Sequence, residues 1–94
     1  MWENYVTAQG AQAALRLIPH YAHAVGVEVD GSRVVLVVQV SPEAPERDEG
    51  IDDIADALQD LLGPAATVST RIDVRPVCDL SASAGVRWFF ASRV

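Results

Sequence analysis

Residues 21–40 read YAHAVGVEVDGSRVVLVVQV, and this stretch decides the fold class. From Tyr21 to Val29 large residues, including His23, alternate with small or acidic ones, which predicts a strand with one buried face. Asp30-Gly31 predicts a tight hairpin turn, because glycine accepts the positive φ that such a turn needs. Residues 34–40 are apolar on both sides, so this second strand is expected inside the sheet with both faces covered.

An amphipathic helix is predicted after the hairpin. Residues 41–49, SPEAPERDE, carry two prolines and lead into a helix that ends at Leu62. Gly63-Pro64 stops it, because glycine adopts the left-handed cap conformation and proline cannot extend a helix. The apolar residues fall at helical spacing on one side: Ile51, Ile54, Ala55, Leu58, Leu61 and Leu62. The polar side carries Asp52, Asp53, Asp56, Gln59 and Asp60.

Three further elements follow from spacing. Residues 2–17 show helical periodicity, with alanines that allow close packing, and Pro19 ends that helix. Residues 67–75 alternate as a half-buried strand that ends at Pro76. Residues 86–93 form a last strand in which one side carries Val86, Trp88 and Phe90 and the other carries Arg87, Phe89, Ala91 and Arg93.

The order helix, strand, strand, helix, strand, strand indicates a single α+β domain over residues 1–94. We expect a two-layer sandwich with a four-stranded, mainly antiparallel sheet and both helices on one face, since two helices are too few to cover both faces. The opposite face is then expected to be open. Its predicted side chains are Arg71, Arg75, Arg87 and Arg93 beside Val35, Val37 and Phe89.

The charge balance points to a protein partner. Thirteen Asp and Glu residues face seven Arg and no Lys, for a net charge of −6. This balance opposes nucleic-acid binding, which depends on cations at the phosphate backbone, and favours a basic partner. No apolar run approaches the length of a membrane span, and the N-terminus lacks a secretory signal, so we expect a cytoplasmic protein without membrane contact.

The sequence shows no catalytic or metal-binding set, so we expect neither an enzyme nor a cofactor. Cys78 is the single cysteine and has no histidine nearby in sequence, which favours a packed thiol over a nucleophile. His20 and His23 are three residues apart in a strand, a spacing that separates them onto opposite faces and is poor for sharing a metal. The aspartates also lack the loop spacing of a calcium site.

Eight of the thirteen acids lie between Glu43 and Asp60, interrupted only by Arg47. A solvent-exposed helix side explains many such runs. Asp60, however, lies near the helix end, where a negative charge is unfavourable to the helix dipole. A charge kept there despite this cost favours a role in binding. The predicted partner-binding residues are Glu46, Asp48, Glu49, Asp52, Asp53, Asp56 and Asp60. The alternative surface is the sheet face, with Arg87, Phe89 and Arg93 as anchors.

Four segments together resemble a family of small bacterial immunity-like proteins: IPHYAHAVGVEVDGSRVVLVVQV, the acidic PERDEGIDDIADALQDLLG, VSTRIDVR and GVRWFFASR. Such proteins are associated with polymorphic and contact-dependent growth-inhibition toxins. The resemblance implies an antitoxin role, in which the chain binds and blocks a cognate toxin domain. The alternative is a homodimeric structural or regulatory module whose open sheet face pairs with a second copy.

Overall fold

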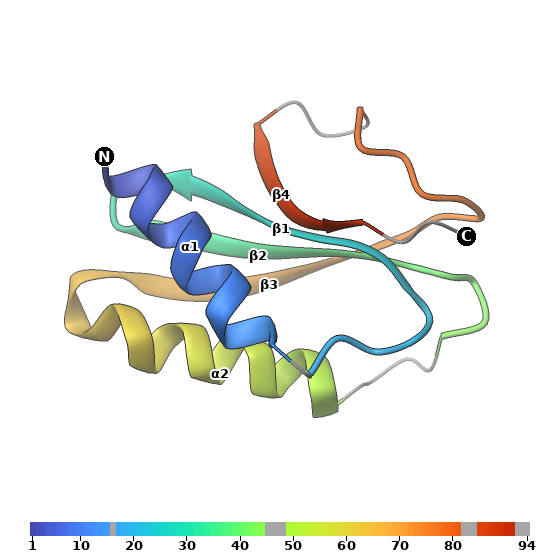
Figure 1. Ribbon diagram of the computed structural model, residues 1–94, viewed down its shortest axis with the longest axis horizontal. Coiled ribbons are helices and arrows are strands. Elements are labelled where there is room, and N and C mark those ends of the chain that lie inside the picture. Colours follow the sequence, from blue (N-terminus) through green and yellow to red (C-terminus); the bar gives the residue numbers. More distant parts are fainter. Residues whose placement is uncertain (16, 45–48, 82–84, 92–94) are drawn as a thin grey trace.

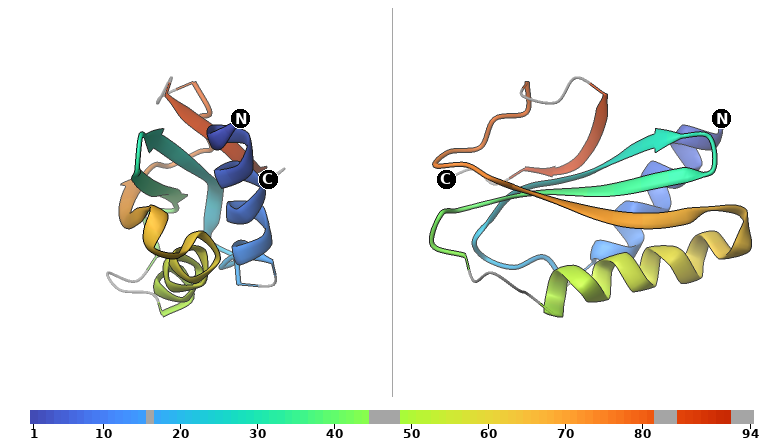
Figure 2. Two further views of the ribbon diagram at one scale, coloured as in Figure 1. Left: turned by 90° about the vertical axis from the view of Figure 1, so that its left-hand side faces the viewer. Right: turned by 180° about the vertical axis from the view of Figure 1, so that it is seen from behind.

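The computed structural model describes residues 1–15, 17–44, 49–81 and 85–91. It confirms the α+β class and the predicted order of elements. Both helices lie on one side of a four-stranded sheet (Figures 1 and 2). The elements are α1 (Trp2–Ala14), β1 (Ala22–Asp30), β2 (Arg33–Val40), α2 (Glu49–Leu62), β3 (Thr67–Val74) and β4 (Val86–Ala91), with a 3-10 turn, Gly63–Ala65, between α2 and β3.

The sheet has the strand order β3-β2-β1-β4 and is mixed, not mainly antiparallel as predicted. β1 pairs antiparallel with β2 and with β4, whereas β3 pairs parallel with β2. The reason is the connection through α2. A helical crossover returns the chain to the end of the sheet where β2 began, so the next strand runs in the same direction as β2.

The hairpin and the α2 boundary follow the sequence prediction. Asp30 pairs with Arg33 across the turn, and Gly31 has a φ of 59°. Gly63 has a φ of 64° directly after α2, as expected of a left-handed helix cap. The helix-side core joins Leu36 of β2 to the apolar side of α2, which includes Leu58.

Helix α1 approaches the sheet closely at Gly10. A Cβ atom added there would lie 2.8 Å from Cε2 of Phe89 and 3.3 Å from Cγ1 of Val27. A larger residue would therefore force either the Phe89 ring or α1 to shift. The helix ends at Ala14, earlier than the predicted Leu17.

The sheet face opposite the helices is less open than predicted, because a segment after β3 that includes Asp79 and Leu80 crosses it. The Gln39 side chain is fully buried and alternates with the helix-side residues of β2. It exchanges two hydrogen bonds with the Asp79 backbone: its Nε2 donates to the carbonyl, and its Oε1 accepts from the amide at 2.9 Å. Trp88 Nε1 donates to the Leu80 carbonyl at 3.0 Å. These bonds fix the crossing segment against the sheet.

Strand β3 is more exposed than its alternating pattern predicted. Val68 packs against the core, but Ile72 is 46% exposed and Val74 is 61% exposed. β3 is an edge strand, and the described residues do not cover its second half as a half-buried strand requires.

We predict that Leu58→Ala lowers the free energy of unfolding by about 2–5 kcal/mol, because it leaves a cavity at a fully buried position of α2. Asp56→Ala, two residues earlier and exposed, is the matched control and should change it by less than about 0.5 kcal/mol. Urea denaturation of both variants measures the difference. Equal shifts in the two midpoints would show that the helix faces are assigned wrongly.

We predict that Gln39→Leu lowers the free energy of unfolding by about 1–3 kcal/mol, because two hydrogen bonds to Asp79 are lost at a buried site. Ser69→Ala, an exposed position of β3, serves as the control. Hydrogen exchange should report faster exchange of the Asp79 amide in Gln39→Leu than in wild type. An unchanged exchange rate at that amide would contradict the anchoring role.

Candidate functional site

The strongest candidate site is the acidic side of α2, formed by Asp52, Asp53, Asp56 and Asp60, all exposed. The opposite side of the same helix is buried at Ile54 and Leu58, so the carboxylates stand on an element that packing holds in place. Asp52, Asp56 and Asp60 follow one another at four-residue spacing. At about 1.5 Å rise per residue, this spacing places successive carboxylates about 6 Å apart along the helix.

Within the described part of the chain, no arginine or histidine forms an ion pair with these four aspartates. Three arginines bond elsewhere. Arg71 pairs with Glu28 at 3.1 Å, Arg75 pairs with Asp73 at 2.8 Å, and Arg87 donates to Oδ1 of Asn4 at 2.8 Å. The negative field of α2 is therefore not neutralised by these side chains.

Asp60 lies in the last turn of α2, where no basic residue is present. A negative charge at this end faces the negative pole of the helix dipole, which costs about 0.3–1 kcal/mol at an exposed position. The helix thus keeps a charge that its own stability does not favour. The position of Asp60 near the helix end is as the sequence predicted.

Some predicted site residues cannot be placed. Glu46, Asp48 and Arg93 lie outside the described residues. Glu49 is the first residue of α2, so the predicted acidic run continues directly into the helix.

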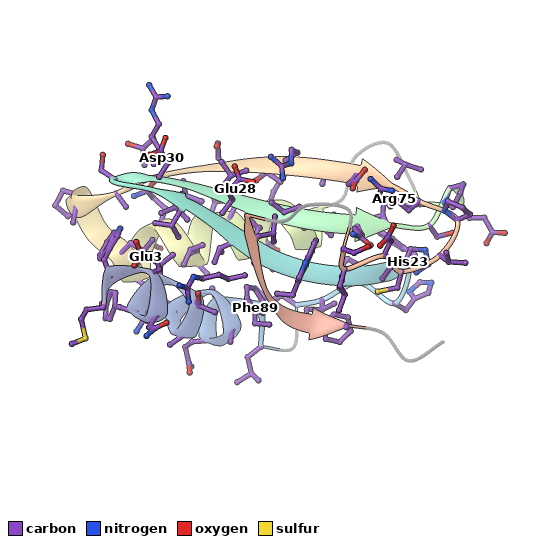
Figure 3. The ribbon with its side chains drawn as sticks, turned by 90° about the horizontal axis from the view of Figure 1, so that it is seen from above. Glu3, His23, Glu28, Asp30, Arg75 and Phe89 are labelled. Carbon is purple, nitrogen blue, oxygen red and sulfur yellow. The ribbon has the colours of Figure 1, made fainter. Side chains whose placement is uncertain are left out.

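The alternative surface is not assembled as predicted, because Arg87 and Phe89 lie on the helix side of the sheet. Arg87 bonds to Asn4 of α1, and the Phe89 ring lies against Gly10 (Figure 3). The cause is an irregularity in the pairing of β1 with β4: Val25 pairs with Phe90 and Gly26 with Trp88, which leaves Phe89 as an extra residue. Strict alternation along residues 86–93 does not reveal such a bulge.

The sequence did not indicate a polar cluster that forms where β1 begins and β3 ends. Its members are His23, Asp73, Arg75 and Asp79. His23 and Arg75 lie at the same end (Figure 3), and His23 Nε2 lies 3.0 Å from the Arg75 carbonyl, to which it donates. The hydrogen bond to Asp73 raises the pKa of Arg75, and the charges of Asp73 and Asp79 act in the same direction. His23 and Arg75 are 52 positions apart in the sequence, so only the fold brings them together.

His23 was expected on the buried face, and this prediction is wrong. A register shift between Ala22 and Ala24 interrupts the alternation at His23, which is half-buried and bonds to the Arg75 carbonyl after the end of β3. The cluster joins β1 to the end of β3 through bonds among its own members, which is a structural role. Cys78 beside it is free and half-buried.

The other features of the described chain offer no chemistry. No group of three His, Cys, Asp or Glu side chains among residues 1–15, 17–44, 49–81 and 85–91 is arranged to hold a metal ion. An open hollow of about 320 Å³ is lined by apolar side chains only: Ala11, Ala14, Leu15, Ile18, Phe89 and Phe90. No described helix is long and apolar enough to cross a membrane.

Comparisons of this chain with protein-family models, with curated proteins and with solved structures find no match. The resemblance to immunity-like proteins therefore rests on the quoted sequence segments alone. What this chain does has to be argued from its own surfaces, of which the acidic side of α2 is the most distinctive.

Proposed function

We propose that this chain is an antitoxin, or immunity protein, that binds a cognate toxin domain and blocks its active site or substrate groove. It acts by protein–protein contact in the cytoplasm and performs no catalysis of its own. The acidic side of α2 is the contact surface, and the toxin presents a basic groove to it.

The observation that carries this proposal is the absence of described ion-pairing partners for Asp52, Asp53, Asp56 and Asp60. Surface charges that stabilise a monomer usually have opposite charges nearby, whereas a surface that recognises a charged partner is complementary to that partner. A row of carboxylates suits an enzyme whose groove binds an anionic substrate such as a nucleic acid. It opposes direct binding of nucleic acid by this chain, since phosphates are repelled.

The mechanism that follows is electrostatic steering followed by occlusion. The field of the acidic side reaches about 10 Å at 0.1 M salt, which raises the rate of encounter with a basic surface before any contact forms. The helix already holds the backbone of these aspartates in place, so little backbone ordering is needed on binding. A blocked groove excludes the toxin's substrate.

We predict that the double variant Asp53→Lys, Asp56→Lys slows toxin association by about tenfold or more, because it reverses the charge at the centre of the acidic side. The measurement uses the partner domain recovered by pull-down from the native cell, with surface plasmon resonance for the rate and rescue of a host expressing that domain for the protection. Raising the salt from about 0.05 to about 0.5 M should weaken wild-type binding as the field is screened.

The matched control is Glu3→Lys, Glu43→Lys, which changes the net charge by the same amount at exposed positions outside α2. It should retain protection and lose less of the association rate. Equal loss in both double variants would mean that net charge alone acts. Full protection by the α2 variant would remove the acidic side as the binding surface.

A further inference from the structure

The outer edge of β3 is the second unusual surface of this protein. The amides of Thr67 and Arg75 donate to carbonyls of the β1–β2 hairpin, at Ser32 and Val40. Because the backbone groups of successive strand residues point to opposite sides, those of Thr70, Ile72 and Val74 point away from β2. These three residues therefore present amides and carbonyls to the free edge of the sheet.

The edge is closed only at its start. Gln59 of α2 accepts a hydrogen bond from the Val68 amide at 2.9 Å and donates to the Ala66 carbonyl at 2.8 Å. Its side chain thus occupies the position that a neighbouring strand would take. Beyond Val68 the described residues provide no comparable side-chain cap.

Two of the devices that keep an edge strand from pairing, proline and a bulge, are missing from the rest of β3. It contains no proline or glycine, and its register with β2 is unbroken from Thr67 to Val74. By contrast, β4, the other edge, carries the bulge at Phe89. A continuous edge with exposed apolar residues, here Ile72 and Val74, is a template for another strand.

We propose that β3 binds β3 of a second copy of this chain, antiparallel and centred on Ile72, so that two four-stranded sheets join into one. In this register Ile72 faces Ile72 of the second copy, and Thr70 faces Val74. These are hydrogen-bonding pairs, so the free amides and carbonyls of all three residues find partners. Their side chains lie on the helix side, where Ile72 and Val74 lose exposure.

Charge selects this register over its neighbours. On the outer face, Arg71 comes opposite Asp73 of the second copy, and the two-fold symmetry makes this pair twice. Moving the centre by one residue in one direction places Arg71 opposite Arg71. Moving it by one in the other direction places Asp73 opposite Asp73. Like charges directly opposite one another destabilise a strand pair, whereas opposite charges stabilise it.

The ion pairs already present extend into the proposed interface. Arg71 pairs with Glu28, and Asp73 pairs with Arg75, all on the outer face. In the dimer, Glu28 and Arg71 of one copy are followed by Asp73 and Arg75 of the second copy, so that acidic and basic side chains alternate across the interface. A network of this kind contributes more than an isolated surface pair.

The two copies each carry a net charge of −6 and repel each other at a distance. Raising the salt from about 0.01 to about 0.1 M should therefore strengthen dimerisation by about tenfold, because the Debye length falls from about 30 to about 10 Å while the contacting pairs are short-range. Salt weakens the proposed toxin contact. The opposite responses separate the two proposals, and dimerisation is measured with the purified chain alone.

The test is sedimentation equilibrium over concentrations up to about 1 mM, which detects even a weak interface. The wild type should dimerise. Arg71→Asp and Asp73→Arg should each weaken the homodimer by about tenfold or more, since each places like charges opposite one another. An equal mixture of the two variants should dimerise again, because one copy then presents only acids and the other only arginines.

Asp60→Arg, an equal charge reversal on α2, is the control and should leave a dimer. Circular dichroism checks that the exposed β3 substitutions leave the fold intact. A wild type that stays monomeric at 0.1 M salt throughout the concentration range overturns the proposal. So does a mixture of the two variants that dimerises no better than either alone, since that result excludes pairing of Arg71 with Asp73.

Discussion

The structure depends on one constraint: β2 is apolar on both of its faces, so both faces of the sheet need a cover. Leu36 and Val38 face the helices, while Val37 is buried on the other side. The described residues form no third α-helix that could cover that second face. The segment at Asp79, anchored by Gln39, and the Trp88 ring beside Gly26 cover part of it instead. A segment that the sequence predicts to be a loop thus covers part of the sheet.

This arrangement also determines which acidic side chains have arginine partners. Arg71 and Arg75 bond to acids on the sheet face, and Arg87 reaches Asn4 of α1. None of these three arginines pairs with an aspartate of α2. Arginine supplies all the basic side chains except histidine, since the chain contains no lysine. The acidic side of α2 is therefore not neutralised by these three side chains, and it is the surface proposed to attract a basic partner. The mixed, internally paired charges of the sheet face exert no such directional field.

The mixed sheet explains why β3 has a bare edge. The α2 crossover adds β3 outside β2, at one margin of the sheet, while α1 packs against α2, β1 and β4. Helix α2 bonds to the start of β3 through Gln59 and Val68, whereas Ile72 and Val74 in the second half of β3 are exposed. The edge of β3 and the acidic side of α2 are different surfaces on different layers. A second copy at the edge and a basic partner at the helix therefore contact different groups, and each surface is open to a separate experiment.

Sequence periodicity alone determined the elements, because the alternation in residues 21–40 and the helical spacing from Ile51 to Leu62 reflect local geometry. It determined the Gly31 turn, the stop at Gly63 and the acidic side of α2 for the same reason. The pairing of strands was decided only by the tertiary structure. Parallel addition of β3, the bulge that turns Phe89 toward Gly10, and the bonds of Gln39 and His23 all join residues distant in sequence. Periodicity specifies which side of an element is apolar, but it carries no information on which neighbour covers that side.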